Sequence, residues 1–367
     1  MTVQALSGKL LTPDGWFAGR LQFDAQLRTF EAAPLADDAP WILPGFIDLH
    51  VHGAAGVDLM QGGAAAQSVC RAHARHGTTA LLATTMTAHR REIEHALQGV
   101  AAAMGHQAPD EAALLGVHLE GPFISPHRLG AQPPLTEVAT LESLLALHAI
   151  APIRVLTIAS EIEPHLALIP ALARLGIRVQ LGHSEATYEQ GQAALRAGAR
   201  GFTHLFNGMS GFSHRAPGLV GLALAEGEYA ELIPDLQHVH PGALRAALRA
   251  IPKAYGVTDA TAATGMPDGE YALGPQRVYK CAGCVRLASG SLAGSALTMD
   301  QALRNLVAIG LELADAARRL STLPAEYLNL IDRGRLAPDA RADLLVFDAA
   351  LQLQQVFIAG HSLDLTT

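Results

Sequence analysis

Lysine and cysteine are both scarce in this chain of 367 residues. Only three lysines are present and the net charge is −8, with no basic block. This composition argues against nucleic acid or an anionic membrane as a main partner. The three cysteines, Cys70, Cys281 and Cys284, are typical of reduced thiols in a cytosol. The Cys281-Ala-Gly-Cys284 pair lacks the second pair that a Cys₄ zinc site needs, and we interpret it as incidental.

Targeting segments are also missing from the sequence. Residues 1–16 lack a basic stretch followed by an apolar run, so we expect no signal peptide. No uninterrupted apolar run reaches about 18 residues, so we expect no membrane span. Half of the residues are hydrophobic and 16% are charged, which is typical of a globular chain. We therefore expect a cytoplasmic protein with one large domain and one small one.

Histidine, in contrast, is abundant, with 17 residues, and two of them stand one residue apart in GFIDLHVHGAAGVD, residues 45–58. Side chains two apart on a strand share a face, so Asp48, His50 and His52 point the same way. Two imidazoles at a strand end suit a metal ion. Taken alone, the pair is equally compatible with two hydrogen-bonded histidines at a loop entrance.

Strand-like apolar runs alternate with helical segments between residues 42 and 337. The runs are 42–49, 78–85, 113–119, 153–159, 177–181, 201–205, 231–236 and 254–258. Amphipathic segments such as 142–148, 165–175, 188–197 and 241–250 lie between them. This alternation predicts a parallel sheet, and about eight units favour a closed (β/α)₈ TIM barrel over an open sheet.

The two ends of the chain have a different pattern. Residues 1–41 and 338–367 show short strands with turn residues and no long helical segment. We predict that both ends pair into one small β-sandwich domain, beside a catalytic metallohydrolase barrel of residues 42–337.

The predicted strands end in polar side chains that are able to bind metal. In order, these residues are His50 with His52, Glu120, His183, His204, His238 and Asp259. In a TIM barrel the chemistry lies at the carboxyl ends of the strands, so a convergent set of this kind predicts a metal site. Asp259 is the candidate base for a metal-activated water. The alternative, a helix N-cap, is weakened by Gly265 and Pro267 in the segment that follows.

Six motifs resemble those of a known family. They are PGFIDLHVHG, HLEGPFISP, LGHSEAT, THLFNGMSG, VTDATAATG and LAGSALTM. In this order and spacing, residues 42–345 resemble the N-acetylglucosamine-6-phosphate deacetylases of the amidohydrolase superfamily. The resemblance implies that a cytoplasmic homodimer hydrolyses N-acetylglucosamine 6-phosphate to glucosamine 6-phosphate and acetate in amino-sugar catabolism.

The resemblance also implies roles for individual residues. Glu120, His183 and His204 would hold the principal metal, and Asp259 would be the proton shuttle. Arg215 and His238 would bind the phosphate. The residues that would line the sugar site, partly through backbone groups, are Ala131, Gln132, Asn207, Gly208, Leu292, Ala293 and Gly294.

The number of metal ions is a further hypothesis, because some members of the family lack the His-x-His pair and bind one ion. We predict a binuclear centre in which His50 and His52 hold one ion and Glu120 bridges to the ion of the other histidines. The predicted metal is zinc, with iron(II) as the alternative. In the competing interpretation, His50 and His52 only support a single ion.

Two positions depart from the family pattern and leave the sugar open. Gln132 stands where many members have a histidine that polarises the substrate carbonyl, and glutamine cannot become a cation. Asp235-Leu236-Gln237 precedes His238 where Asp-Gly is frequent. The galactosamine epimer is therefore an alternative substrate.

Three other functions compete with this one. A dihydroorotase would need a bridging lysine, but Lys9, Lys253 and Lys280 all lie away from the relevant strand ends. A D-amino-acid deacylase would not need the Arg215 and His238 pair. A non-catalytic sugar-phosphate sensor would not need a proton shuttle such as Asp259.

Overall fold

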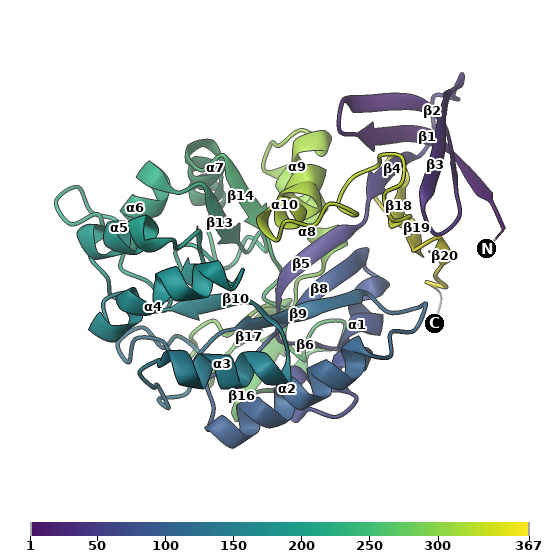
Figure 1. Ribbon diagram of the computed structural model, residues 1–367. Coiled ribbons are helices and arrows are strands. Elements are labelled where there is room, and N and C mark those ends of the chain that lie inside the picture. Colours follow the sequence, from purple (N-terminus) through teal and green to yellow (C-terminus); the bar gives the residue numbers. More distant parts are fainter. Residues whose placement is uncertain (1, 366–367) are drawn as a thin grey trace.

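The computed structural model describes residues 2–365, in which eight parallel strands close into a barrel (Figure 1). The barrel strands are β5 (Phe46–Val51), β8 (Thr78–Thr84), β9 (Ala113–Leu119), β10 (Ile153–Ile158), β11 (Arg178–Leu181), β12 (Gly201–Phe202), β13 (Tyr229–Leu232) and β14 (Lys253–Gly256). Backbone hydrogen bonds from Leu205 to Glu231 (2.8 Å) and from Asp259 to His50 (3.0 Å) complete the ring. The predicted TIM barrel is thereby confirmed.

Helices cover the outside of the barrel in the order that the alternating pattern predicts. They are α1 (Ala65–Ala74), α2 (Arg90–Met104), α3 (Leu141–Ile150), α4 (Glu163–Arg174), α5 (Tyr188–Ala197), α6 (Gly218–Glu226), α7 (Pro241–Ala250), α8 (Met299–Ala308), α9 (Leu313–Leu320) and α10 (Thr322–Tyr327). Because helices lie on one face and barrel side chains on the other, a strand such as β8 is buried along its whole length. Within residues 2–365, none of the helices is both long and apolar enough to cross a bilayer.

Both ends of the chain join in one seven-stranded sheet. Its order is β20-β19-β18-β4-β1-β2-β3, so β4 pairs with β18 on one side and with β1 on the other. The strands are β1 (Gln4–Thr12), β2 (Gly15–Phe23), β3 (Leu27–Ala32), β4 (Trp41–Pro44), β18 (Leu344–Phe347), β19 (Leu353–Ile358) and β20 (His361–Ser362). The sheet has its own apolar core, which includes Leu21, Phe23 and Phe357. The predicted small β domain from both termini is present.

The segment expected to be a single strand over 42–49 is divided at Gly45. Residues before it form β4 of the terminal sheet, and residues after it form β5 of the barrel. The backbone N–H of Gly45 donates to the carbonyl of Asp343 at 2.9 Å, and a side chain at position 45 would collide with Thr79. The terminal sheet is therefore directly continuous with the strand that carries His50.

Short strands and one further helix complete the structure. A small hairpin, β6 (Gly53–Ala54) with β7 (Val57–Asp58), and the 3₁₀ helix η1 (Leu59–Gln61) follow His52. Between β14 and α8 the chain forms a three-stranded antiparallel sheet, β15 (Gly269–Leu273), β16 (Gln276–Cys281) and β17 (Cys284–Arg286). This insertion brings Leu273 and Leu292 to the carboxyl ends of the barrel strands.

Candidate metal centre and substrate cavity

Glu120 lies at the centre of a cluster of four histidines. Its Oε1 is 3.1 Å from Nε2 of His183 and 2.9 Å from Nε2 of His204. Its Oε2 is 3.3 Å from Nε2 of His52 and 3.5 Å from Nε2 of His50. Each carboxylate oxygen thus faces one pair of imidazoles, and all five side chains are buried. The five residues come from the carboxyl ends of β5, β9, β11 and β12.

The hydrogen bonds around the imidazoles fit this cluster to divalent cations. Nδ1 of His50 lies 3.0 Å from a carboxylate oxygen of Glu231, and Nδ1 of His183 lies 2.7 Å from the carbonyl of Arg128. Both acceptors require a proton on Nδ1, so Nε2 of each neutral ring presents a lone pair. Those lone pairs face the oxygens of Glu120, so a divalent cation placed between them would be bound by nitrogen and oxygen together. Imidazole nitrogen and carboxylate oxygen are ordinary ligands of zinc.

Three residues of the site have left-handed backbone conformations. The φ angles are 46° at His183, 28° at His204 and 52° at Asp259. Residues other than glycine rarely adopt positive φ, and strain of this kind gathers at functional sites. Each of the three directly follows or closely follows a barrel strand, where the turn directs its side chain toward the cluster.

Asp259 is placed next to the His50 and His52 side of the cluster. Its Oδ1 lies 3.2 Å from Nε2 of His52 and 3.5 Å from Nε2 of His50. Burial by itself raises the pKa of this carboxyl group, but His50 and His52 in their protonated form outweigh burial and lower the pKa below its usual value. Asp259 is therefore ionised and able to accept a proton.

A cavity of about 280 Å³ opens onto the cluster. Most residues to which the resemblance assigns substrate contacts line it. They are Ala131, Gln132, Asn207, Gly208, His238, Leu292 and Gly294. Ala293 is buried beside it and is not part of the lining. Met86, Phe206 and Leu273 also line the cavity, although the sequence analysis gave them no role.

Gln132 is bonded to the cluster itself. Its amide nitrogen donates to Oε2 of Glu120 at 2.8 Å, and its amide oxygen accepts from the backbone N–H of Thr87 at 2.7 Å. The Thr87 bond fixes which end of the amide faces Glu120. The N–H₂ group thus points into the site, where it supports the carboxylate.

His238 is held at the cavity by Asp235. Its Nδ1 lies 2.7 Å from Oδ2 of Asp235, whose other oxygen accepts from the backbone N–H of His238 at 2.9 Å. Burial by itself lowers the pKa of His238, but the Asp235 carboxylate raises it above its usual value. A partly cationic ring suits an anionic or hydroxyl-bearing ligand.

Arg215 is the one predicted substrate residue that lies well apart from this cavity. Its side chain is exposed, and its Nε donates to Nε2 of His214 at 2.9 Å. It borders a separate cavity of about 370 Å³ formed with Glu185 and Tyr188. Among the described residues that line the metal-side cavity there is no lysine or arginine.

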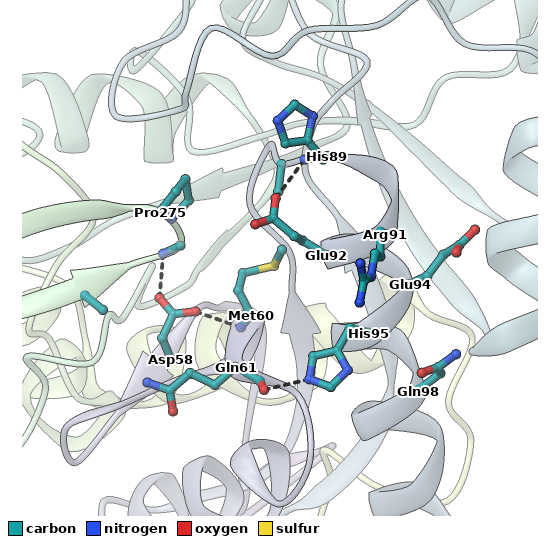
Figure 2. Close-up of a pocket in the computed structure, with 13 residues that line it drawn as sticks. Asp58, Met60, Gln61, His89, Arg91, Glu92, Glu94, His95, Gln98 and Pro275 are labelled. Atoms are coloured by element: carbon teal, nitrogen blue, oxygen red, sulfur yellow. Dashed lines mark hydrogen bonds between the residues drawn. The ribbon is translucent and has the colours of Figure 1, made fainter.

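A larger cavity, of about 920 Å³, lies between η1, the N-terminal half of α2 and the turn between β15 and β16 (Figure 2). Several of its polar groups are bonded to neighbouring backbone. Asp58 accepts from Met60 (2.7 Å) and Gly274 (2.8 Å), and Nε2 of His95 lies 3.1 Å from the carbonyl of Gln61. The three groups of described residues that are close enough to bind a metal all lie elsewhere. The smaller cavity is therefore the candidate active site.

Glu231 is a buried residue of the site that the sequence analysis missed. It is fully buried on β13 and contacts both His50 and the backbone of His204. The sequence does contain a signal for this residue. Glu231 is a charged residue at a predicted strand, and an ionised side chain is costly to bury unless it has partners.

Comparisons with known proteins identify the family of the chain. The amidohydrolase family profile matches residues 41–363. An N-acetylgalactosamine-6-phosphate deacetylase of Escherichia coli O157:H7 is 39% identical, over 98% of this chain and 99% of that protein. An N-acetylglucosamine-6-phosphate deacetylase of Lysinibacillus sphaericus is 38% identical, over 98% and 96%. A Mycobacterium smegmatis N-acetyl-D-glucosamine-6-phosphate deacetylase variant, in complex with N-acetyl-D-glucosamine-6-phosphate, superposes with a TM-score of 0.92 at 33% identity, covering 99% of both chains.

Proposed function

This chain belongs to the amidohydrolase family, and we propose that it is a metal-dependent deacetylase that hydrolyses N-acetylglucosamine 6-phosphate to glucosamine 6-phosphate and acetate in amino-sugar catabolism. The observation that carries the proposal is the Glu120 cluster with ionised Asp259 at the wall of a small cavity. The names of the full-length relatives supply the substrate class.

The same five residues would hold two divalent ions. His50 and His52 would hold one ion, His183 and His204 would hold the other, and Glu120 would contribute to both. We propose zinc, with iron(II) as the alternative, because histidine nitrogen suits both. Such ions, when bound, polarise the acetyl carbonyl and make the attacking water more acidic.

Asp259 moves the proton in this proposal. Its carboxylate accepts a proton from the attacking water as the new C–O bond forms at the acetyl carbon. It then returns that proton to the amide nitrogen as the C–N bond breaks, so that the amine and acetate leave without a net change on the enzyme. Met86, Phe206 and Leu273 contribute apolar surface to the wall of the cavity.

Among residues 2–365, the cavity of one chain offers a phosphate only one cationic side chain. His238 is present there, but no lysine or arginine is among the described lining residues. Arg215 lies on an exposed loop together with Phe212, which is 62% exposed. We propose that this loop contacts a second copy of the chain in a homodimer and that Arg215 of the partner subunit binds the phosphate.

The galactosamine epimer is a second candidate substrate. The relative that acts on N-acetylgalactosamine 6-phosphate is 39% identical and one that acts on N-acetylglucosamine 6-phosphate is 38% identical. Overall identity therefore does not separate the two sugars, which differ only at the C4 hydroxyl.

Acetate release from a panel of substrates tests the function. The panel contains both epimers as 6-phosphates, both without phosphate, and an N-acetyl-D-amino acid. We expect the highest kcat/KM with N-acetylglucosamine 6-phosphate and a large loss without phosphate. A higher kcat/KM with N-acetylgalactosamine 6-phosphate would establish the galactosamine epimer as the substrate. A higher kcat/KM with the N-acetyl-D-amino acid would refute both sugar phosphates.

A further inference from the structure

A chain of buried polar side chains crosses the barrel interior and ends at His50. Every member is at most 1% exposed, and consecutive members are 2.7–3.4 Å apart. In order, they are His118, Thr157, Thr203, Gln180, Tyr255, Glu231 and His50. Barrel interiors are usually filled by apolar side chains, so a continuous polar chain here indicates a function.

Glu231 is the only carboxylate of that chain, and three donors surround it. Its Oε2 lies 3.0 Å from Nδ1 of His50 and accepts from the backbone N–H of His204 at 3.2 Å. Its Oε1 accepts from the hydroxyl of Tyr255 at 3.4 Å. That hydroxyl itself accepts from the amide of Gln180 at 2.9 Å, so its own proton is directed to Glu231.

The neighbouring histidine does not compete for this carboxylate. Nδ1 of His118 lies 3.0 Å from the carbonyl of Leu49, and its Nε2 lies 2.8 Å from the hydroxyl of Thr157. Nδ1 of His118 is 3.9 Å from Glu231, beyond hydrogen-bond distance. His50 is therefore the only imidazole that Glu231 bonds directly among residues 2–365.

The four histidines of the cluster are held unequally. Nδ1 of His183 has a backbone carbonyl as its partner, whereas Nδ1 of His52 and Nδ1 of His204 have no hydrogen-bond partner among the described residues. Among the four Nδ1 atoms, only that of His50 has a carboxylate oxygen as its hydrogen-bond partner. An acceptor on Nδ1 fixes the proton there, turns Nε2 toward a metal and makes it a stronger ligand, an effect worth about 10- to 100-fold in metal affinity.

We propose that Glu231 is a positioning residue whose negative charge holds His50 in the Nδ1–H tautomer, makes Nε2 a stronger ligand and so sets the metal affinity of the His50 and His52 half of the centre. This inference rests on the proposed binuclear centre. Glu231 touches no substrate, and it acts through His50. Its backbone contact with His204 leaves the ring of His204 free, so the other half of the centre depends on it much less.

Two matched variants separate this role from a general effect on the barrel. Glu231→Gln keeps the size of the side chain and an oxygen for His50 but removes the charge. Tyr255→Phe is the control, because it removes the bond to the other oxygen of Glu231 and leaves His50 untouched. We expect Glu231→Gln to weaken zinc binding at one of two sites by about 10- to 100-fold, and Tyr255→Phe to change both sites by less than about threefold.

Zinc dissociation constants are measured by competition with a chromophoric chelator, beginning with metal-free protein whose fold is checked by circular dichroism. Equal weakening of both sites, or the same loss in Tyr255→Phe, would overturn the proposal. A second measurement needs no variant. Nitrogen-15 NMR of histidine-labelled, zinc-loaded wild type should show the ring proton of His50 on Nδ1, and a proton on Nε2 would overturn the proposal even where Glu231→Gln does not fold.

The outcomes also separate this inference from the proposed function. Wild-type protein that binds two ions and deacetylates the sugar phosphate, with unchanged affinities in Glu231→Gln, would refute the role of Glu231 alone. A wild-type protein that binds a single ion would refute the binuclear centre and this inference together. Absence of acetate release from every sugar phosphate, with both affinities as expected, would refute the proposed function alone.

Discussion

Oδ1 of Asp259 lies 3.2 Å from Nε2 of His52, within the group of side chains that surrounds Glu120. The two residues are separated by most of the barrel in sequence, and the backbone bond from Asp259 to His50 joins their strand ends. A carboxylate in this position would accept a proton from a water molecule at the proposed metal centre. This relationship makes Asp259 the first residue to change.

Asp259→Asn should keep the fold and the metal but lose turnover by about 10²- to 10⁴-fold, because the amide cannot accept the proton. The change is nearly isosteric, so metal content by elemental analysis serves as the control. If the variant kept more than about a tenth of wild-type kcat with full metal content, Asp259 would not be the proton shuttle.

Arg215→Ala should raise KM for the phosphorylated sugar sharply and barely change activity on the unphosphorylated sugar, because an arginine–phosphate contact is directional and charged. Equal losses on both substrates would argue against a phosphate role.

Mixed dimers test where Arg215 acts. Each of the variants Asp259→Asn and Arg215→Ala should be weak alone. If the partner supplies Arg215, exchange of subunits between them creates one site with both residues intact, and activity should recover. Activity that stays at the sum of the two separate samples would place Arg215 in its own chain's site or outside the reaction.

The double variant His50→Ala/His52→Ala should bind one zinc ion per chain after reconstitution, whereas the wild type should bind two. Glu120, His183 and His204 remain in the variant and supply three ligands. Elemental analysis after removal of excess zinc gives both numbers. One ion in both proteins would contradict the binuclear centre.

His73 makes the stability of the protein depend on pH. Burial lowers the pKa of His73 to about 4, and its Nε2 lies 3.2 Å from the carbonyl of Gly53. Between pH 6.5 and 4 the unfolded chain binds the proton more readily than the folded one, so stability is lost as the pH falls through this range.

The variant His73→Gln keeps a donor for Gly53 and does not titrate. Between pH 7.5 and pH 5, the wild type should lose about 2 kcal/mol more of its free energy of unfolding than this variant does. Urea denaturation of both metal-free proteins measures the difference. Parallel loss in the two proteins would show that His73 is not responsible.

The positions of the ligands could be predicted because they follow from strand order. His50, Glu120, His183 and His204 each come at or just beyond the end of an apolar run, and parallel strands bring such ends together. The division of residues 42–49 into β4 and β5 could not be predicted, because the apolar run continues across Gly45 and only the pairing partners change.

Three other features could not be predicted from local sequence patterns. The hydrogen bond from Gln132 to Glu120 depends on the backbone N–H of Thr87, which orients the amide. No local sequence pattern indicates this contact. The contact of Glu231 with His50 joins β13 to β5, which are far apart in sequence. The distance of Arg215 from the cavity likewise follows from the path of one exposed loop.

Because Ile42 pairs with Val346, the terminal sheet joins two strands that are made at very different times during synthesis of the chain. β4 is made before the barrel strands and its partner β18 after all of them, so this part of the terminal sheet cannot form until the barrel segment has been made. A chain that stops before residue 344 leaves one edge of β4 unpaired, and unpaired strand edges promote aggregation. Because β4 runs directly into β5, such a fragment also lacks support next to His50. Truncation before residue 344 should therefore yield insoluble, metal-poor protein, even though residues 344–365 do not line the cavity.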